Sequence, residues 1–202
     1  MDRTTQQPTV QTQVPTPAHA AESFGRHVAL LGLMGTGKTA VGTELASALG
    51  VRFDDNDSRL TAESGLTPRE LRNRDGIVML HSLEAKHFLG ALRSPTPGVV
   101  SAAASVIEDG SCREALRNPE ICAIWLRVEP STLAARFHRE AHRPIFSDDL
   151  QGFFDSQLAA RAPLYQQVSD VVIDTDGLTV AEVVELVLPI VDQHLAAAPR
   201  PV

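Results

Sequence analysis

Cysteine is nearly absent from this chain of 202 residues, which contains only Cys112 and Cys122. Two cysteines with no CxxC spacing and no second pair cannot build a disulfide framework or a structural zinc site. Chains that use neither are typical of a reducing compartment. We therefore expect a cytoplasmic protein whose fold depends on an ordinary hydrophobic core.

The chain also lacks long apolar runs and an excess of positive charge. No stretch approaches the roughly 18 apolar residues that a membrane-spanning helix needs, and the first residues have no apolar core like that of a signal peptide. The formal net charge is −7, which argues against a protein that coats nucleic acid or an anionic membrane. We expect neither partner.

What the chain does contain is enough apolar sequence for one core. Hydrophobic residues make up 43% of the chain, which suits a single α/β domain of this length but hardly two. Residues 1–24 are mostly Gln, Thr, Pro and Ala, which bury too little apolar surface to offset the entropy of ordering. We expect a disordered leader over 1–24, one domain over 25–195 and a flexible tail over 196–202.

Within that domain, short β-rich runs alternate with longer helical patterns. Such alternation predicts an α/β fold with a parallel sheet that is covered by helices on both faces. In sheets of this kind, ligands bind outside the carboxyl ends of the strands. The pattern predicts strands at 27–31, 51–53, 98–101, 122–128 and 171–174, and helices at 38–49, 67–73, 80–92, 130–139, 150–158 and 180–194.

The first expected strand runs directly into a glycine-rich motif. Residues 32–39 read GLMGTGKT, which fits G-x-x-x-x-G-K-[ST] at every fixed position. Glycines let several backbone N–H groups point at one phosphate, a lysine adds positive charge near the β/γ oxygens, and a Thr hydroxyl can bind Mg²⁺. We therefore expect ATP and Mg²⁺ as cofactors, with nucleotide contacts from Gly35, Thr36, Gly37, Lys38, Thr39 and Ala40.

A phosphate loop alone does not select a reaction. A guanine-selecting N-K-x-D sequence is absent, which argues against a GTPase. The second expected strand ends in the acidic run FDDND at 53–57. Carboxylates at this end of a strand, beside a phosphate loop, can hold Mg²⁺ and reach the hydroxyl group of an acceptor. The run is therefore a candidate functional site.

Together these motifs resemble those of the shikimate kinases, a branch of the nucleoside-monophosphate-kinase-like P-loop fold, over roughly residues 26–192. The resemblance implies a P-loop three-layer sandwich and phosphoryl transfer from ATP to a hydroxyl group. It assigns Thr39 and Asp55 to Mg²⁺, and Asp57 to the acceptor hydroxyls as candidate general base. Lys38, Asp57 and Arg143 would be the catalytic residues.

Two further segments match the family. Arg136 and the run RPI at 143–145 resemble a mobile lid, which implies that Arg136 contacts the nucleotide and Arg143 the transferring phosphoryl group. The run RAPLY at 161–165 matches R-x-P-L-Y, whose arginine pairs with the substrate carboxylate in that family. Alternatively, Arg161 is a cation near a helix end with no role in substrate binding.

The acceptor side departs from the family pattern at two places. His81 stands where a second carboxylate-binding arginine belongs, and a mostly neutral His cannot pair bidentately as Arg does. Losing such a charged hydrogen bond costs about 1.5–3 kcal/mol. Ala103, Ala104 and Ser105 occupy the positions of a Gly-Gly-Gly segment, so we expect this loop to have changed shape. Candidate acceptor contacts are Asp57, His81, Ala103, Ala104 and Arg161.

Three functions remain open from the sequence. The chain could be a shikimate kinase with relaxed recognition, which makes shikimate 3-phosphate, or a kinase for another small polyol, cyclitol or hydroxy acid. It could also be a nucleotide-binding module without turnover. Retention of Asp57, Arg136 and Arg143 favours the kinases, because binding alone needs neither a base nor a lid. We expect a monomer with a small hydroxyl-bearing molecule as its acceptor.

Overall fold

A five-stranded parallel sheet forms the centre of the computed structural model, which describes residues 26–139 and 149–196. The strand order is β2-β3-β1-β4-β5. All five residues of β1 are buried, as expected for a central strand covered on both faces. The strands are β1 (His27–Leu31), β2 (Arg52–Asp55), β3 (Gly98–Ser101), β4 (Ile121–Arg127) and β5 (Val171–Asp174).

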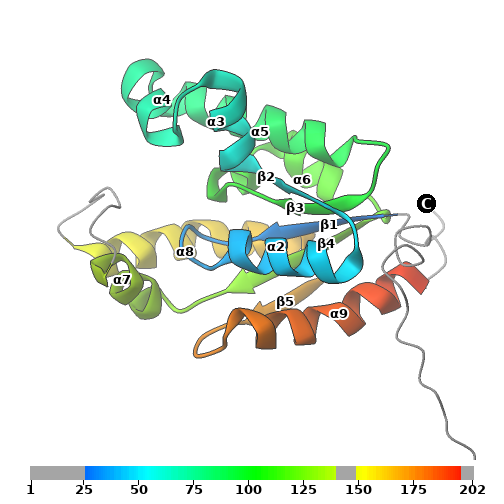
Figure 1. The fold of residues 1–202 in the computed structure, drawn as a ribbon. Helices are drawn as coiled ribbons and strands as arrows, with labels where there is room; N and C mark the ends of the chain where they lie inside the picture. Colours follow the sequence, from blue (N-terminus) through cyan, green and yellow to red (C-terminus); the bar gives the residue numbers. More distant parts are fainter. Residues whose placement is uncertain (1–25, 140–148, 197–202) are drawn as a thin grey trace, which may run out of the picture.

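Helices cover both faces of this sheet, so the molecule has three layers (Figure 1). The helices are α2 (Lys38–Leu49), α3 (Asn56–Ser64), α4 (Pro68–Asp75), α5 (Ile77–Leu92), α6 (Gly110–Leu116), α7 (Pro130–Arg139), α8 (Leu150–Val168) and α9 (Val180–Ala196), with a short 3₁₀ helix, η1 (Ala104–Glu108). No described helix is both long and apolar enough to cross a bilayer.

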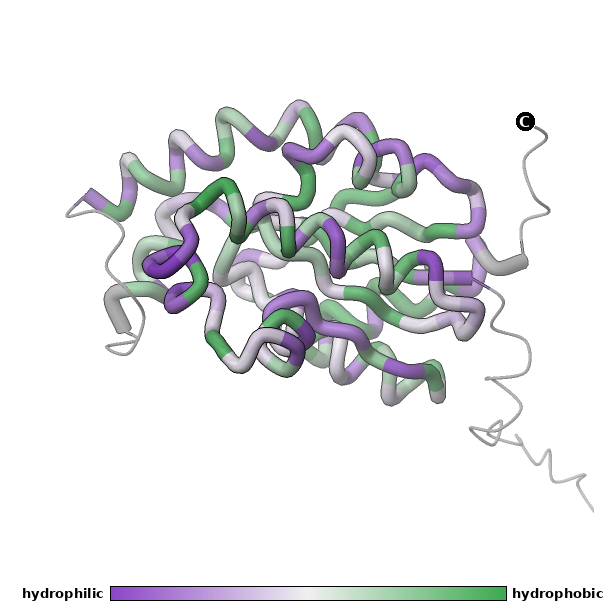
Figure 2. Tube along the Cα trace, turned by 90° about the horizontal axis from the view of Figure 1, so that it is seen from above, coloured by the Kyte–Doolittle hydropathy of each residue, from purple (hydrophilic) through white to green (hydrophobic). Residues whose placement is uncertain are grey.

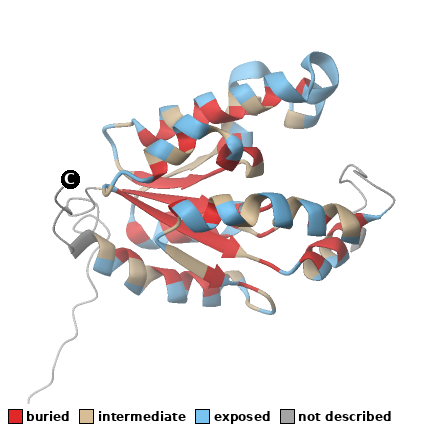
Figure 3. Ribbon diagram, turned by 180° about the vertical axis from the view of Figure 1, so that it is seen from behind, coloured by how far each residue is buried: buried red, intermediate tan, exposed pale blue. Residues whose placement is uncertain are grey.

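Each face of the sheet has its own apolar core. On one face, Leu45 of α2 and Val187 of α9 pack against alternate β1 residues such as Leu30. On the other face, Phe88 of α5 and Tyr165 of α8 belong to a cluster with helices α6 and α7. Hydrophobic residues gather at the centre of the molecule in Figure 2, and the inner strands β1, β3 and β4 are almost wholly buried (Figure 3).

The α3–α4 segment projects from one end of this body and has only a small core of its own. Leu60, Leu71 and Leu80 form that cluster, and α4 is largely exposed (Figure 3). The capping box of α4 sets its start, since the Thr67 hydroxyl accepts from the Glu70 N–H and the Glu70 carboxylate accepts from the Thr67 N–H.

The expected α/β fold with a parallel sheet and helices on both faces is confirmed. The differences lie in the helices. The acidic run at 53–57 spans the end of β2 and the start of α3, and neither α3 nor α6 was expected. Helix α8 continues through Pro163 to Val168, well past the expected end at 158, although proline disfavours a helix interior. The expected leader and most of the tail lie outside the described residues.

Candidate active site

The phosphate loop connects β1 to α2 and requires glycine at its ends. Gly32 has φ 142°, and a Cβ there would meet the Leu126 carbonyl oxygen at 2.6 Å. Gly37 has φ 93° as the residue that precedes α2. No side chain caps the first turn of α2 and no acidic residue lies in it. The N-terminal amides of α2 are therefore suited to bind an anion.

Lys38 lies buried inside the curl of this loop. Its Nζ donates to the carbonyl oxygens of Gly32, at 3.0 Å, and Leu33, at 2.8 Å. Burial lowers the pKa of Lys38 to about 8, although the neighbouring carboxylates of Asp57 and Asp55 oppose that shift. A buried ammonium with only carbonyl partners gains from a nearby polyphosphate, so the cradle fits the expected nucleotide.

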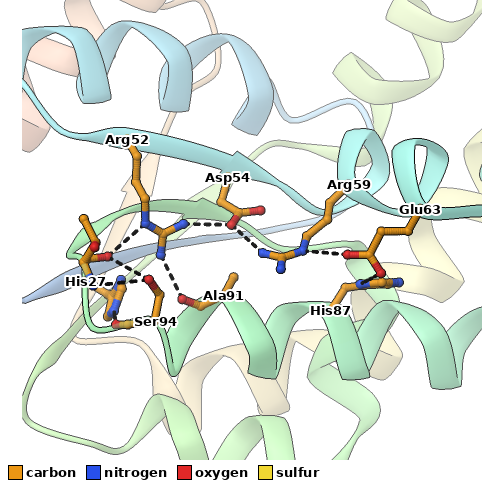
Figure 4. Close-up of polar contacts among 9 residues, drawn as sticks. His27, Arg52, Asp54, Arg59, Glu63, His87, Ala91 and Ser94 are labelled. Carbon is orange, nitrogen blue, oxygen red and sulfur yellow. Dashed lines mark hydrogen bonds and ion pairs between the residues drawn. The ribbon is translucent and has the colours of Figure 1, made fainter.

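The two carboxylates at the end of β2, Asp54 and Asp55, have different partners. Asp54 accepts from Arg52 and Arg59, both at 2.8 Å, in a chain of polar contacts that joins β2, α3 and α5 (Figure 4). Asp55 instead accepts from the Thr39 hydroxyl at 2.9 Å and caps α3 through the Ser58 N–H. Asp54 therefore has a structural role and Asp55 faces the phosphate loop.

Thr39 and Asp55 offer the donor set that Mg²⁺ prefers. A hydroxyl and a carboxylate already lie at hydrogen-bond distance from each other, beside the buried Lys38. Mg²⁺ takes hard oxygen ligands and is usually held by one or two protein groups together with substrate phosphates. The residues present fit that ion.

Asp57 lies in the first turn of α3 and lines the same cavity as the phosphate loop. Its side chain reaches solvent, yet the surrounding protein removes enough water to raise its pKa. The Asp55 carboxylate adds to that increase and the Lys38 ammonium opposes it. A carboxylate with a raised pKa is a stronger base than an ordinary one, which suits a proton acceptor.

Arg161 is already paired in this structure. It donates from Nε to the Glu108 carboxylate at 2.8 Å and from a terminal nitrogen to the Gln157 side chain. The His81 Nδ1 lies 4.0 Å from the other Glu108 oxygen. Partial burial lowers the pKa of His81, with Arg161 and Arg72 adding to that effect against Glu108. His81 is therefore neutral near pH 7.

The loop after β3 adopts a backbone that needs no glycine. Ala103 has φ −62°, and no non-glycine residue in the described ranges has a positive φ. The Tyr165 hydroxyl donates to the Ala104 carbonyl oxygen at 3.3 Å, and its ring stacks on Trp125. Tyr165 of the RAPLY run therefore holds this loop through a hydrogen bond and does not itself line the cavity.

Glu84 is a buried carboxylate of α5 beside this loop. It accepts a hydrogen bond from the Ser105 hydroxyl, and its exposed fraction is only 6%. Burial raises its pKa to about 7, Asp57 contributes further, and the Ser105 bond and Arg161 oppose the increase. Among the described residues, no arginine or lysine forms an ion pair with the Glu84 carboxylate.

One cavity of about 1060 Å³ brings most of these groups together. Its walls include the predicted residues of the phosphate loop, the second strand and the acceptor side, which are Gly35, Gly37, Lys38, Thr39, Ala40, Asp55, Asp57, His81, Ala103, Ala104 and Arg161. Thr36 is buried beneath the loop, where its hydroxyl donates to the Leu33 carbonyl oxygen. Residues that were predicted from sequence motifs therefore line one cavity in the folded chain.

The expected lid is described only in part. Arg136 of α7 donates to the Gly35 carbonyl oxygen at 3.0 Å, which ties α7 to the phosphate loop. Arg143 lies outside the described residues. The assignments of Arg136 to the nucleotide and of Arg143 to the phosphoryl group both stay predictions.

Other cavity residues were not predicted from the sequence. Arg69 and Arg72 of α4 lie on its outer wall, and Glu84 and Gln157 on its inner one. Glu108, which pairs with Arg161, comes from η1 and lies 53 positions away in sequence. The sequence places Glu108 shortly after the third strand, but that position does not reveal its pairing with Arg161.

A second cluster of ligand-type side chains lies at the opposite edge of the sheet. Cys122, Asp170 and His194 have ligand atoms within 4.8 Å of one another. Burial raises the pKa of Cys122 to about 12, Asp170 accepts from the Ala123 N–H, and the His194 Nε2 lies 3.2 Å from the Pro119 carbonyl oxygen. A protonated thiol with two engaged neighbours is a packing arrangement and a poor metal site.

Comparison with known proteins gives a consistent result. A family model described as shikimate kinase matches residues 34–192. The shikimate kinase of Symbiobacterium thermophilum is 35% identical over 161 residues, which cover 78% of this chain and 91% of that protein. The shikimate kinase of Mesorhizobium japonicum is 31% identical over 151 residues, which cover 74% of this chain and 73% of that protein.

Solved structures show the same fold. A shikimate kinase from Acinetobacter baumannii in complex with shikimate has a TM-score of 0.80 at 23% identity, with 88% of this chain and 99% of that chain covered. A gluconokinase from Sinorhizobium meliloti has a TM-score of 0.53 at 21% identity, with 84% and 93% covered. The fold is therefore shared by kinases of more than one acceptor.

Proposed function

The chain belongs to the shikimate kinase family and is a small-molecule kinase, and from that premise we propose that it transfers the γ-phosphoryl group of ATP to a hydroxyl group of an acceptor bound in the described cavity. We further propose that residues 25–195 form the kinase domain and that it acts as a cytoplasmic monomer. Free Cys112 and Cys122 are in keeping with a reducing compartment.

The nucleotide would bind at the phosphate loop. The uncapped start of α2 and the N–H groups of residues 35–40 would hold its phosphates, and the Lys38 ammonium would move from the loop carbonyls to the phosphate oxygens. Arg136 would contact the nucleotide from α7, and Arg143 would approach the transferring group. Thr39 and Asp55 would hold Mg²⁺, which neutralises phosphate charge when it is bound.

The chemical step would depend on Asp57. The acceptor oxygen attacks the γ-phosphorus, the bond from that phosphorus to the β-phosphate oxygen breaks, and ADP leaves with the electron pair. The hydroxyl proton passes to the Asp57 carboxylate, whose raised pKa suits this role. Lys38 and Arg143 would stabilise the charge on the phosphoryl oxygens.

The observation that carries this proposal is the 2.9 Å hydrogen bond from Thr39 to Asp55. This bond joins the phosphate loop to the end of β2, and Asp57 follows two residues later in α3. The candidate metal ligands, Thr39 and Asp55, and the candidate base, Asp57, therefore line the same cavity. A nucleotide-binding module without turnover would need no base at that position.

Shikimate is the default acceptor, because the curated relatives are named shikimate kinase. Phosphorylation would convert shikimate to shikimate 3-phosphate. A second candidate is another small polyol, cyclitol or hydroxy acid. Neutral His81 and the side chains at Ala103 and Ala104 favour that second candidate, since they differ from what the family resemblance expects at the carboxylate-binding positions.

A steady-state assay of ADP release tests the proposal, with Mg·ATP and shikimate, quinate, gluconate and inositol as acceptors and with the product identified by mass spectrometry. We expect turnover with at least one acceptor. Asp57→Asn keeps the shape of the side chain but removes the base, so kcat should fall by roughly 10²-fold or more. Lys38→Met should abolish ATP turnover.

Glu114→Gln provides the matched control, because Glu114 is an exposed residue of α6 outside the cavity. This variant should keep wild-type kinetics. Substantial turnover by Lys38→Met, or by Asp57→Asn at half the wild-type rate, would refute the assigned roles.

A further inference from the structure

Arginines from two separate helices approach His81 at the acceptor end of the cavity. Arg72 of α4, His81 of α5 and Arg161 of α8 all line this cavity. Both arginines lie close enough to His81 to lower its pKa. Leu71 and Leu80 pack together in the small core of the projecting segment, so Arg72 and His81, which follow them in sequence, are held at the junction of α4 and α5.

One face of α4 forms the outer wall of the cavity (Figure 1 shows the projecting helix). Pro68, Arg69, Arg72 and Asn73 line the cavity, and this spacing places them on one side of the helix. The capping box at Thr67 fixes where the helix starts. Arg72 is exposed, yet it belongs to the helix face that is turned towards the acceptor.

Arg161 can still receive an acceptor carboxylate. Its Nε donates to the Glu108 carboxylate at 2.8 Å and its Nη1 donates to the Gln157 side chain. A guanidinium carries several N–H donors, and these two bonds leave the second terminal nitrogen able to bind a carboxylate. Because Glu108 offsets part of the positive charge, Arg161 alone attracts an anionic acceptor less strongly than it would without that partner. A second cation would compensate for this.

The other basic side chains that line the cavity in the described part of the chain are less suited to this task. Lys38 donates to two carbonyl oxygens of the phosphate loop, which keeps it on the nucleotide side. His81 is neutral near pH 7. Arg69 lies one helical turn before Arg72 and is not among the groups that shift the pKa of His81. Arg72 is therefore the cation best placed to act with Arg161.

We propose that Arg72 binds the carboxylate of the acceptor together with Arg161, and that it supplies the positive charge that His81 does not. This inference rests on the proposed kinase function and deepens it, because it makes the acceptor a small hydroxy acid. One guanidinium comes from the projecting helix α4 and the other from α8, so the carboxylate joins the two parts of the cavity wall. Arg72 is a specificity residue, since it contacts the carboxylate and not the reacting atoms. An acceptor that fills the cavity also removes water from Arg72, which makes this pair stronger than an ordinary surface ion pair.

The test compares acceptors that differ only in the carboxylate. Shikimate is paired with the analogue in which a hydroxymethyl group replaces the carboxylate, and gluconate is paired with glucitol, which differs from it in the same way. The readout is the ratio of kcat/KM values within each pair, measured on the full-length enzyme with Mg·ATP. In the pair that the wild type phosphorylates, we expect it to prefer the acid by roughly tenfold or more.

Arg72→Gln should remove much of that preference. The KM for the acid should rise by roughly tenfold or more, whereas kcat and the KM for the neutral partner should change little, because only the carboxylate contacts Arg72. Arg72→Ala should give the same result, and it decides the matter if Arg72→Gln fails to fold. Arg74→Gln is the matched control, since Arg74 is an exposed arginine of α4 that pairs with Asp75 and does not line the cavity. This control should keep the wild-type ratios.

The outcomes separate this inference from the function on which it rests. An equal rise in KM for the acid and its neutral partner would show that Arg72 maintains the shape of α4 and does not bind the carboxylate, which overturns the inference. An unchanged preference in the Arg72 variants, or a wild-type preference for the neutral partner, would overturn it as well. Each of these results leaves the kinase intact. Absence of turnover with every acceptor would overturn the proposed function, and the inference with it.

Discussion

Glu84 shows how a single neighbour changes the chemistry of a side chain. The family resemblance places an arginine three residues before it, one helical turn away, where this chain has His81. A neutral imidazole cannot offset the cost of burying a carboxylate, so burial raises the pKa of Glu84 to about 7. At the residue scale, this protein therefore has a carboxyl group that titrates near neutral pH.

That titration predicts a dependence of stability on pH. Unfolded Glu84 would ionise at its ordinary value of 4.5, and folded Glu84 near 7. Between these values the folded state binds the extra proton, so the contribution of Glu84 to stability is fully present below about pH 4.5 and is lost as pH rises through about 7. A Gln side chain does not ionise, so Glu84→Gln lacks this loss. The change that this substitution makes in the free energy of unfolding should therefore be more favourable at pH 8 than at pH 5, by about 1–3 kcal/mol.

Urea unfolding of the wild type and Glu84→Gln at pH 5 and pH 8 measures the difference. The Gln side chain can still accept from Ser105, so the local geometry is kept. Glu114→Gln should show no such difference between the two pH values. Equal effects of Glu84→Gln at both would mean that folded Glu84 ionises as an ordinary carboxylate.

At the element scale, α8 illustrates what local patterns miss. Pro163 favours a helix end near 158, yet α8 continues to Val168 because Tyr165 and Val168 are buried in the core. This extension puts Arg161 on the face of a continuous helix, where Glu108 and Gln157 can reach it. Tertiary packing overrides the local preference of proline, and it decides where the arginine points.

The contact between α7 and the phosphate loop leads to a prediction about the nucleotide. Arg136 donates to the Gly35 carbonyl oxygen at 3.0 Å. Arg136→Ala removes this tie and one cation from the nucleotide side, so KM for ATP should rise by roughly tenfold or more, and KM for the acceptor should change little. Steady-state kinetics with each substrate varied in turn measures both. A selective increase in the acceptor KM would show that Arg136 belongs to the acceptor side.

At the scale of the whole molecule, the cavity is assembled from segments that are far apart in sequence. The parallel register places Asp55 opposite Ser101, and Leu30 opposite the same residue, so the ends of β2, β3 and β1 lie at one edge. The phosphate loop, the acidic run and the loop after β3 meet there. Ligand binding at such a junction should stabilise several elements together.

Thermal unfolding with nucleotide tests this coupling. A ligand at 100 times its Kd stabilises the folded state by about 2.7 kcal/mol, which corresponds to a rise in Tm of about 5–10 °C for a chain of this size. We expect this rise with Mg·ATP and a smaller one when EDTA removes the metal. Lys38→Met should show almost no rise. An unchanged Tm in the wild type at millimolar Mg·ATP would contradict binding at the phosphate loop.

The sequence by itself determined the fold class, and it predicts the residues of the nucleotide half of the site. Alternating apolar runs and helical patterns predict a parallel sheet. The phosphate-loop spacing of Lys38 and Thr39 and the place of Asp55 at a strand end predict a phosphate and metal site, because the carboxyl ends of parallel strands meet at one edge of the sheet. Asp57 could be placed for the same reason.

Only the tertiary structure decided the state of the acceptor half. The pairing of Arg161 with Glu108, the burial of Glu84 beside Ser105 and the position of Arg72 join residues 21 to 53 positions apart or on separate helices. Such contacts depend on how α4, α5, η1 and α8 pack together, and no local pattern encodes that packing. The ionisation of a buried carboxylate depends on the same neighbours, so it too becomes visible only once the chain has folded.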